Sequence, residues 1–207
     1  AELTAAYRAR TQGKNPSFSP IEISYADYNA WLAAWMRDSG TSERQLAFWK
    51  EHLEGAPERL DLPTDLPRTA SRSHRAGVLA VELPAVMGQA LKNLAQQQGT
   101  TVFPLLLAAY AELLGRLTRQ QDVVVGVPVA ARTGKGDDGL VGFFVNTLAL
   151  RLNRTGQCDT RALLGRTADL VRQTLEHQLL PFDQLVENLS FSRSLEHSPV
   201  FQVLAGA

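Results

Sequence analysis

The chain has 207 residues, of which 44% are hydrophobic, and it carries 21 basic and 21 acidic side chains. This length allows one large globular domain or two small ones, and the zero net charge, with no basic stripe, disfavours nucleic acid as a partner. No stretch reaches the roughly 18 continuous apolar residues of a membrane span, so we expect no membrane association. The only cysteine, Cys158, is given no role, and a lone thiol fits a cytoplasmic location.

The first third of the chain is predicted to be helical, with a long connector. Residues 1–12 have helical spacing with no capping residue before them, which predicts the tail of a helix that begins elsewhere and a chain cut from a longer protein. Tyr25, Tyr28, Trp31 and Trp35 fall on one face of a helix, which we interpret as core. Asp27 is either a helix cap or a solvent-facing residue.

The rest of the chain alternates strands with helices. A further helix is expected at 42–53, followed by a proline-rich connector. The predicted elements then run strand, helix, helix, strand, strand, helix, helix and strand, at residues 78–83, 85–98, 102–118, 123–125, 143–150, 160–177, 182–189 and 200–204. This alternation predicts an α/β fold, a two-layer sandwich of helices on a mixed sheet.

Few residues indicate chemistry by themselves. Asn146 interrupts an apolar strand, and its amide must either be satisfied by the fold or face a wet channel. The four histidines, including His74, lie at no spacing that implies a catalytic triad. The adjacent Asp137 and Asp138 sit in a glycine loop, where neighbouring aspartates point different ways and more often keep a loop hydrated than bind a metal. Motifs of hydrolases, nucleotide-binding proteins and zinc sites are absent from the sequence.

Six segments resemble, in order, the condensation domain of nonribosomal peptide synthetases, whose fold is similar to chloramphenicol acetyltransferase. They are ISYADYNAW at 23–31, QLAFWKEHLEGAPERLDLPTDLPR at 45–68, TVFPLLLAAYAELLGRLTRQQDVVVGVPVAAR at 101–132, LVGFFVNTLALR at 140–151, HQLLPFDQLVENL at 177–189 and SPVFQV at 198–203. The resemblance covers nearly the whole chain.

The resemblance implies two similar lobes with a tunnel between them. Residues 1–70 would form the end of the first lobe with aromatic helices and the connector, and residues 71–207 the second-lobe core, truncated at its C-terminal end. The family's HHxxxDG motif is absent and would belong upstream of Ala1. No catalytic residue is therefore expected in this segment, which alone should be inactive.

The implied reaction is amide formation between a donor acyl or peptidyl thioester and an acceptor aminoacyl thioester. Both are carried on phosphopantetheine arms of donor and acceptor carrier proteins, beside an adenylation domain in the same megasynthase for secondary metabolites. The resemblance implies no cofactor of the chain's own and no metal. It assigns to the tunnel Val127, Pro128, Arg132, Phe143, Phe144, Asn146 and Thr147, and to structural roles Gln178, Pro181 and Phe182.

Two other functions remain open at this point. One is a non-catalytic condensation-like docking platform for a partner protein, which a degraded upstream motif would favour. The other is a free-standing acyltransferase that uses thioesters.

Overall fold

The computed structural model describes residues 2–18, 20, 23–66, 76–132, 139–154, 159–189 and 197–206. The chain divides into two compact units. The first comprises Ala1–Ser39 and Arg132–Phe143, and the second comprises Gly40–Ala131 and Phe144–Ala207. The predicted lobe boundary at residue 70 falls outside the described residues and stays a prediction.

The first unit contains α1 (Glu2–Thr11) and α2 (Tyr25–Asp38). α2 begins with a capping box, in which Ser24 Oγ accepts from the Asp27 N–H at 3.2 Å and the Asp27 carboxylate accepts from the Ser24 N–H at 3.1 Å. The Ser24 hydroxyl also donates to the Asp27 carboxylate at 2.6 Å, and this bond, together with that from the Ser24 N–H, holds the pKa of Asp27 below its ordinary value. Of the two alternatives for Asp27, the structure shows the cap.

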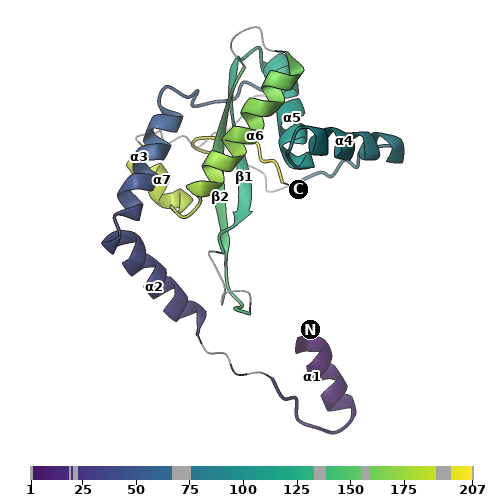
Figure 1. The fold of residues 1–207 in the computed structure, drawn as a ribbon, viewed down its shortest axis with the longest axis vertical. Helices are drawn as coiled ribbons and strands as arrows, with labels where there is room; N and C mark the ends of the chain where they lie inside the picture. Colours follow the sequence, from purple (N-terminus) through teal and green to yellow (C-terminus); the bar gives the residue numbers. More distant parts are fainter. Residues whose placement is uncertain are drawn as a thin grey trace. The chain divides into compact units, whose positions relative to one another are not determined.

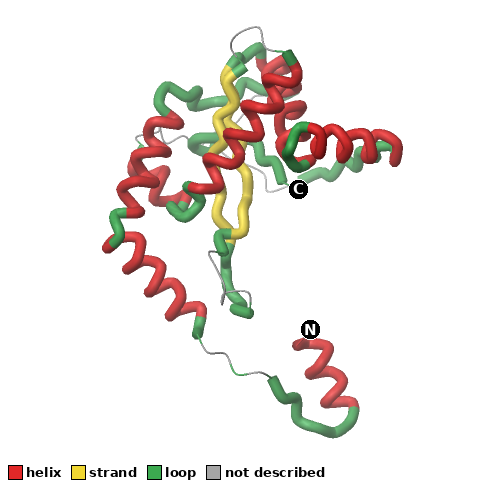
Figure 2. The backbone as a smooth tube through the Cα atoms, in the orientation of Figure 1, coloured by secondary structure: helices red, strands yellow, loops and turns green. Residues whose placement is uncertain are grey.

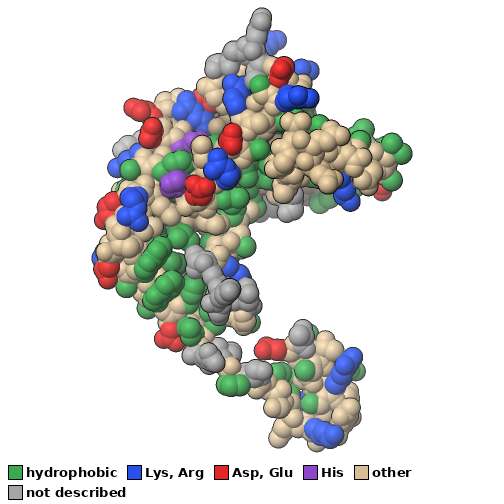
Figure 3. Space-filling view, viewed as in Figure 1, with side chains coloured by type: hydrophobic (Ala, Val, Ile, Leu, Met, Phe, Trp, Pro, Cys, Tyr) green, Lys and Arg blue, Asp and Glu red, His purple; other side chains and the backbone are tan. Residues whose placement is uncertain are grey.

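The aromatic face of α2 is only partly buried. Tyr28 is buried, whereas Trp31 and Trp35 are 54% and 40% exposed and stack on each other at 6.0 Å between ring centroids. Figure 3 shows apolar side chains gathered over this helix. The prediction of a core stripe is wrong for the two tryptophans, because helical spacing aligns side chains on a face but does not determine what covers it.

The second unit packs helices on a small sheet. Its elements are α3 (Thr41–Leu53), α4 (Ala85–Gln97), α5 (Val102–Thr118), β1 (Asp122–Ala130), β2 (Val145–Asn153), α6 (Thr160–Glu176) and α7 (Phe182–Asn188). Figure 1 shows α6 lying across the β1–β2 pair, and α5 contacts both α6 and β1. Val123, Val125, Leu148 and Leu150 of the strands are almost fully buried in one apolar cluster with Trp49 of α3.

β1 and β2 form an antiparallel pair, visible as two long strands in Figure 2. Its register runs from Asp122 opposite Asn153 to Ala130 opposite Val145. On the other side of β1, Gly126 bridges Leu204 in parallel, through bonds of 3.0 and 2.9 Å with the backbone of residues 203 and 205. Within the described residues the sheet has two antiparallel strands, and the strand predicted at 200–204 is reduced to this single parallel bridge beside β1.

The strand predicted at 78–83 does not form. These residues lie outside any strand, and Val78 and Val81 are 98% and 76% exposed. The prediction is wrong because an apolar run becomes a strand only where a neighbouring strand accepts its backbone hydrogen bonds, and none within the described residues pairs with this one.

α5 is apolar because it is a core helix, with seven buried residues facing the strands and neighbouring helices. Within the described ranges, no single helix has both the length and the hydropathy to cross a membrane. Among the described helices, α4 and α5 would have the required length and hydropathy only if they were counted as one span, and a bend of 106° separates them.

The close approach of the C-terminal segment to β1 requires a glycine at position 126. A Cβ there would collide with the ring of Phe201 and, at 2.6 Å, with the side chain of Leu204. Gly126→Ala should therefore lower the free energy of unfolding by about 1 to 3 kcal/mol, the usual cost of overpacking. Urea denaturation measures this change.

Gly165→Ala is the matched control, because a Cβ at this position of α6 meets open space and alanine favours helix. We expect Gly165→Ala to be neutral or stabilising. Equal midpoints for the two variants would contradict the packing of Phe201 on Gly126.

Candidate functional site

The β1–β2 pair distributes the predicted tunnel residues over its two faces. Pro128 lies opposite Thr147 and Val127 opposite Leu148, and residues directly opposite each other share a face. Because successive side chains alternate, Pro128 and Thr147 lie on one face, and Val127 and Asn146 on the other. The sequence segment FVNT therefore cannot present all its side chains to one surface.

Val127 faces an apolar cavity under α6. This cavity has a volume of about 180 Å³ and is lined by residues from β1, β2, α5 and α6, among them Phe103, Leu150, Val171 and Leu175. Val127 itself is buried. The cavity offers apolar contact and no ionisable group from its lining.

The amide of Asn146 is fully used by the chain's own backbone. Its Nδ2 donates to the carbonyl oxygens of Gln178 and Leu180 at 2.8 and 2.7 Å. Its Oδ1 accepts from the N–H of Thr147 at 2.9 Å and of Phe182 at 3.1 Å. Of the two alternatives for this amide, the fold satisfies it; the position of this strand in a tunnel wall stays a prediction.

The segment 177–182 is held by two more side chains, both from α3. Gln45 Oε1 accepts from the Leu180 N–H at 2.7 Å, and Trp49 Nε1 donates to the His177 carbonyl at 2.9 Å. We call residues 177–182, fixed by Gln45, Trp49 and Asn146, the clamped segment. Sequence reasoning missed Gln45, although a glutamine on the buried face of a helix is the signal that could have indicated it.

The residues predicted to be structural lie in this segment. Gln178 contributes its backbone carbonyl to Asn146, and Pro181 is the N-cap residue of α7. Phe182 is half-buried and its ring lies 5.1 Å from that of Phe201. These positions are compatible with the predicted packing roles.

Two histidines lie at α3: His52 belongs to this helix, and His177 packs against it. The His177 ring stacks on Phe48 at 3.7 Å between centroids, with its Nδ1 2.8 Å from the Gln173 carbonyl oxygen. His52 Nε2 accepts from the N–H of Arg151 at 3.2 Å. Burial of the ring, reinforced by the Arg151 guanidinium, lowers the pKa of His52 to about 4, so His52 is neutral at pH 7.

Arg151 joins both strands to α3. Its Nε and Nη2 donate to the Asp122 carboxylate at 2.9 and 2.6 Å, and its Nη1 donates to the carbonyl oxygens of His52 and Glu54. This network is occupied by protein groups on several sides. It stabilises the β1–β2 pair, although Asp122 Oδ1 is buried without a hydrogen-bond partner among the described residues.

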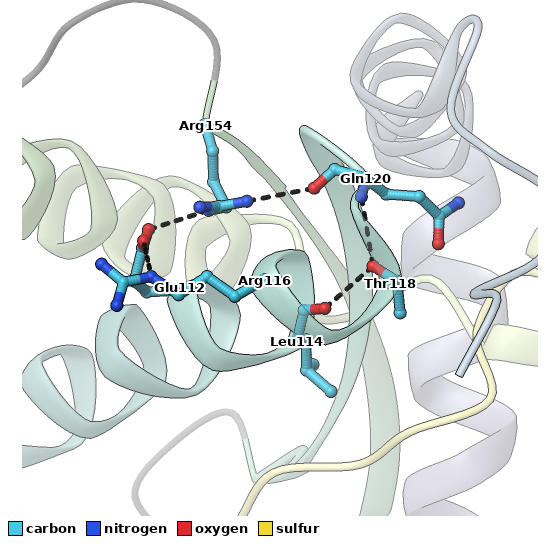
Figure 4. Close-up of polar contacts among 6 residues, drawn as sticks. All are labelled: Glu112, Leu114, Arg116, Thr118, Gln120 and Arg154. Carbon is cyan, nitrogen blue, oxygen red and sulfur yellow. Dashed lines mark hydrogen bonds and ion pairs between the residues drawn. The ribbon is translucent and has the colours of Figure 1, made fainter. Parts of the chain in front are cut away.

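A second ion-pair cluster lies at the end of the β1–β2 pair where Asp122 pairs with Asn153 (Figure 4). Glu112 accepts from Arg116 at 2.8 Å and from Arg154 at 2.9 Å, and both bonds keep the pKa of Glu112 below its usual value. Arg154 also donates to the Gln120 carbonyl oxygen at 3.1 Å. The Arg154 guanidinium lies over Gly115, where any Cβ would collide with it. This cluster fastens α5 to the end of β2.

Two predicted tunnel residues, Arg132 and Phe143, belong to the first unit. Arg132 Nη2 donates to the Leu140 carbonyl oxygen at 3.0 Å, and the Phe143 carbonyl oxygen accepts from the Tyr25 hydroxyl at 2.8 Å. Phe144, in the second unit, is buried and its carbonyl oxygen accepts from the Ala131 N–H. The tunnel roles of all three stay predictions.

Several residues considered in the sequence are outside the described residues: His74, Asp137, Asp138 and Cys158. In the part of the chain that the structure describes, no group of three histidine, cysteine or acidic side chains comes together as a metal site would require.

The condensation-domain family model matches residues 1–205. A linear gramicidin synthase of Brevibacillus parabrevis is 43% identical over 203 residues, which are 98% of this chain and 3% of that relative. The chain belongs to the condensation-domain family, and the resemblance inferred from sequence is confirmed. The chain spans only a small part of the length of these relatives, which are multidomain nonribosomal peptide synthetases.

Solved structures confirm the fold. The X-domain from teicoplanin biosynthesis superposes with a TM-score of 0.88 at 29% identity, over 98% of this chain and 46% of the X-domain, and it has also been solved in complex with OxyB. A four-domain nonribosomal peptide synthetase bound to AMP and glycine superposes with a TM-score of 0.76 at 30% identity, over 78% of this chain and 12% of that one. The predicted chloramphenicol acetyltransferase-like α/β fold is thus confirmed.

Asn146→Ala should destabilise the protein by about 2 to 4 kcal/mol, because it leaves carbonyl oxygens and an N–H of the clamped segment without partners. Chemical denaturation measures the change. Asn188→Ala is the control, since Asn188 also donates to a backbone carbonyl but lies exposed at the end of α7. If both variants unfold at the same midpoint, water replaces the Asn146 amide at no cost.

The protein should lose stability as the pH falls from about 6.5 to about 4. In this window the unfolded chain binds a proton at His52 that the folded chain does not, so the free energy of unfolding decreases by about 2 to 3 kcal/mol. The groups facing His52 are Arg151, which lowers its pKa, and Asp122, which raises it.

His52→Gln should remove this dependence above about pH 5.5, where the unfolded chain has not yet begun to bind protons at Glu112 and Asp27, whose pKa values are also lowered in the folded protein. Unfolding midpoints at a series of pH values test this. A slope between about pH 6.5 and pH 5.5 that is unchanged by His52→Gln would show that His52 is not its source.

Proposed function

We propose that this chain is part of a condensation domain that forms an amide between two carrier-bound substrates. The amine nitrogen of an acceptor aminoacyl thioester attacks the carbonyl carbon of a donor acyl or peptidyl thioester. The C–N bond forms, the C–S bond breaks, and the proton lost by the amine ends on the departing sulfur. Family membership over residues 1–205 supports this proposal.

The geometry of the ladder is the observation that best supports it. At the end of β1 and β2 that carries Pro128, Ala130, Val145 and Thr147, one face stays open: Pro128 and Ala130 are exposed and Val145 is 51% exposed. The opposite face of the same strands is anchored to the clamped segment through Asn146. A rigid strand pair with one uncovered face is suited to be the wall of a substrate passage.

Two of the described histidines, His52 and His177, support a proton acceptor supplied from elsewhere. His52 is neutral and accepts a backbone hydrogen bond, and His177 is stacked on Phe48 with one nitrogen already beside a carbonyl oxygen. Neither presents a free nitrogen to the open face described above. The HHxxxDG histidine, placed by the resemblance upstream of Ala1, fits the role that they leave unfilled.

The substrates would arrive on phosphopantetheine arms of donor and acceptor carrier proteins, with an adenylation domain in the same megasynthase. The structural similarity to a four-domain nonribosomal peptide synthetase supports this setting. The chain needs no cofactor of its own for the reaction, because the thioester supplies the activated carbonyl.

A docking platform is the second candidate. One observation favours it: the X-domain, with which this chain shares a TM-score of 0.87, has been solved in complex with OxyB. A platform would bind its partner through this fold and form no amide.

Single-turnover assays on the complete protein separate the two functions. The donor carrier is loaded with an acyl group and the acceptor carrier with an aminoacyl group, and intact-protein mass spectrometry follows transfer to the acceptor. Amide on the acceptor carrier is the expected result. Two loaded carriers that yield no amide over many hours, with the protein folded, would reject condensation and favour the platform.

A further inference from the structure

FVNT contains two polar side chains, Asn146 and Thr147, on opposite faces of β2. Both were predicted to meet substrate. The hydrogen-bonding capacity that each retains in the folded protein differs, and this difference decides which of them is available to a ligand.

Every hydrogen-bonding group of the Asn146 amide already has a partner in the chain. Its two N–H donors are used by the carbonyl oxygens of Gln178 and Leu180, and its oxygen accepts two backbone N–H groups. To bind a substrate, this amide would have to abandon bonds that hold the clamped segment.

Thr147 retains its hydroxyl. Its backbone N–H bonds to Asn146, but within the described part of the chain its Oγ1 has no hydrogen-bond partner. The side chain is half-buried, on the same face as Pro128 opposite it. This hydroxyl can therefore donate and accept a hydrogen bond toward solvent or a ligand.

The neighbours of Thr147 on this face are apolar. Pro128 has no N–H and Ala130 and Val145 have aliphatic side chains, so the hydroxyl is the polar group that this patch of four side chains presents. Pro128, Ala130 and Val145 are exposed, so a ligand can reach this patch. Such a surface fits a mainly apolar chain with one polar atom to be positioned.

We propose that Thr147, not Asn146, is the substrate-facing residue of this strand. Its hydroxyl forms one hydrogen bond with the carrier-bound substrate, donating to the thioester carbonyl or accepting from the amine. Asn146 acts only through the clamped segment. This inference rests on the proposed amide-forming function.

Thr147→Val in the complete protein tests it. Valine replaces the hydroxyl with a methyl group and keeps the β-branched shape, so the strand should form as before. We expect kcat/KM for amide formation to fall about 3- to 10-fold, as for the loss of one neutral hydrogen bond, with an unchanged unfolding midpoint. Thr147→Ser should restore the rate to within about twofold of wild type.

Comparing the change in KM with the change in kcat identifies which substrate atom the Thr147 hydroxyl binds. With a small aminoacyl thioester as acceptor, a raised KM for the acceptor in Thr147→Val assigns the bond to the amine. A lowered kcat at saturating acceptor assigns it to the donor carbonyl.

Thr118→Val is the matched control. Thr118 also carries a half-buried hydroxyl, but it bonds to the Leu114 carbonyl and the Gln120 N–H at the end of α5, away from the open face (Figure 4). It should leave both kinetic constants unchanged.

The outcomes are distinct. Wild-type rates for Thr147→Val, or equal losses for Thr147→Val and Thr147→Ser, overturn the role of the hydroxyl while leaving the proposed function in place. A wild-type protein that forms no amide overturns the proposed function itself.

Discussion

The hydrogen bonds between Asn146 and residues 178–182 are the constraint on which this region depends. They join β2 to the turn between α6 and α7, where Gln45 and Trp49 of α3 add bonds from the other side. Each of these backbone groups would otherwise need water in a largely buried place. The strand pair is therefore held from one face at Asn146, while on the opposite face only the end that carries Pro128, Ala130 and Val145 is exposed.

The pleat of the strands then separates structural from functional roles. Neighbouring residues in FVNT serve opposite surfaces, so Asn146 holds the fold while Thr147 remains available. This division also explains why an amide in a strand of a substrate-binding segment need not touch substrate. Polar side chains close in sequence can differ completely in remaining hydrogen-bonding capacity.

The buried polar residues at the other end of the ladder serve stability. Arg151 and Arg154 each connect a strand end to carboxylates and backbone carbonyls, and His52 is kept neutral by its burial. Because His52 must remain unprotonated for the Arg151 N–H to donate to it, this packing is sensitive to acid. These groups lie toward the end of the strand pair that carries Asp122 and Asn153, whereas Thr147 lies toward the end that carries Ala130 and Val145.

The sequence by itself determined the helices, the presence of strands at β1 and β2, the α/β class and the family, because periodicity and motif order are local properties of the chain. It did not determine the length of β1, which was predicted at 123–125 and continues through Pro128 to Ala130 because β2 pairs with it along its whole length. It also indicated that Asn146 needs partners. Only the tertiary structure supplied them, since residues 178–182 and Gln45 are brought to Asn146 and Leu180 by packing across long sequence separations. The exposure of Trp31 and the unpaired residues 78–83 were likewise decided by which surfaces meet, and periodicity carries no information about that.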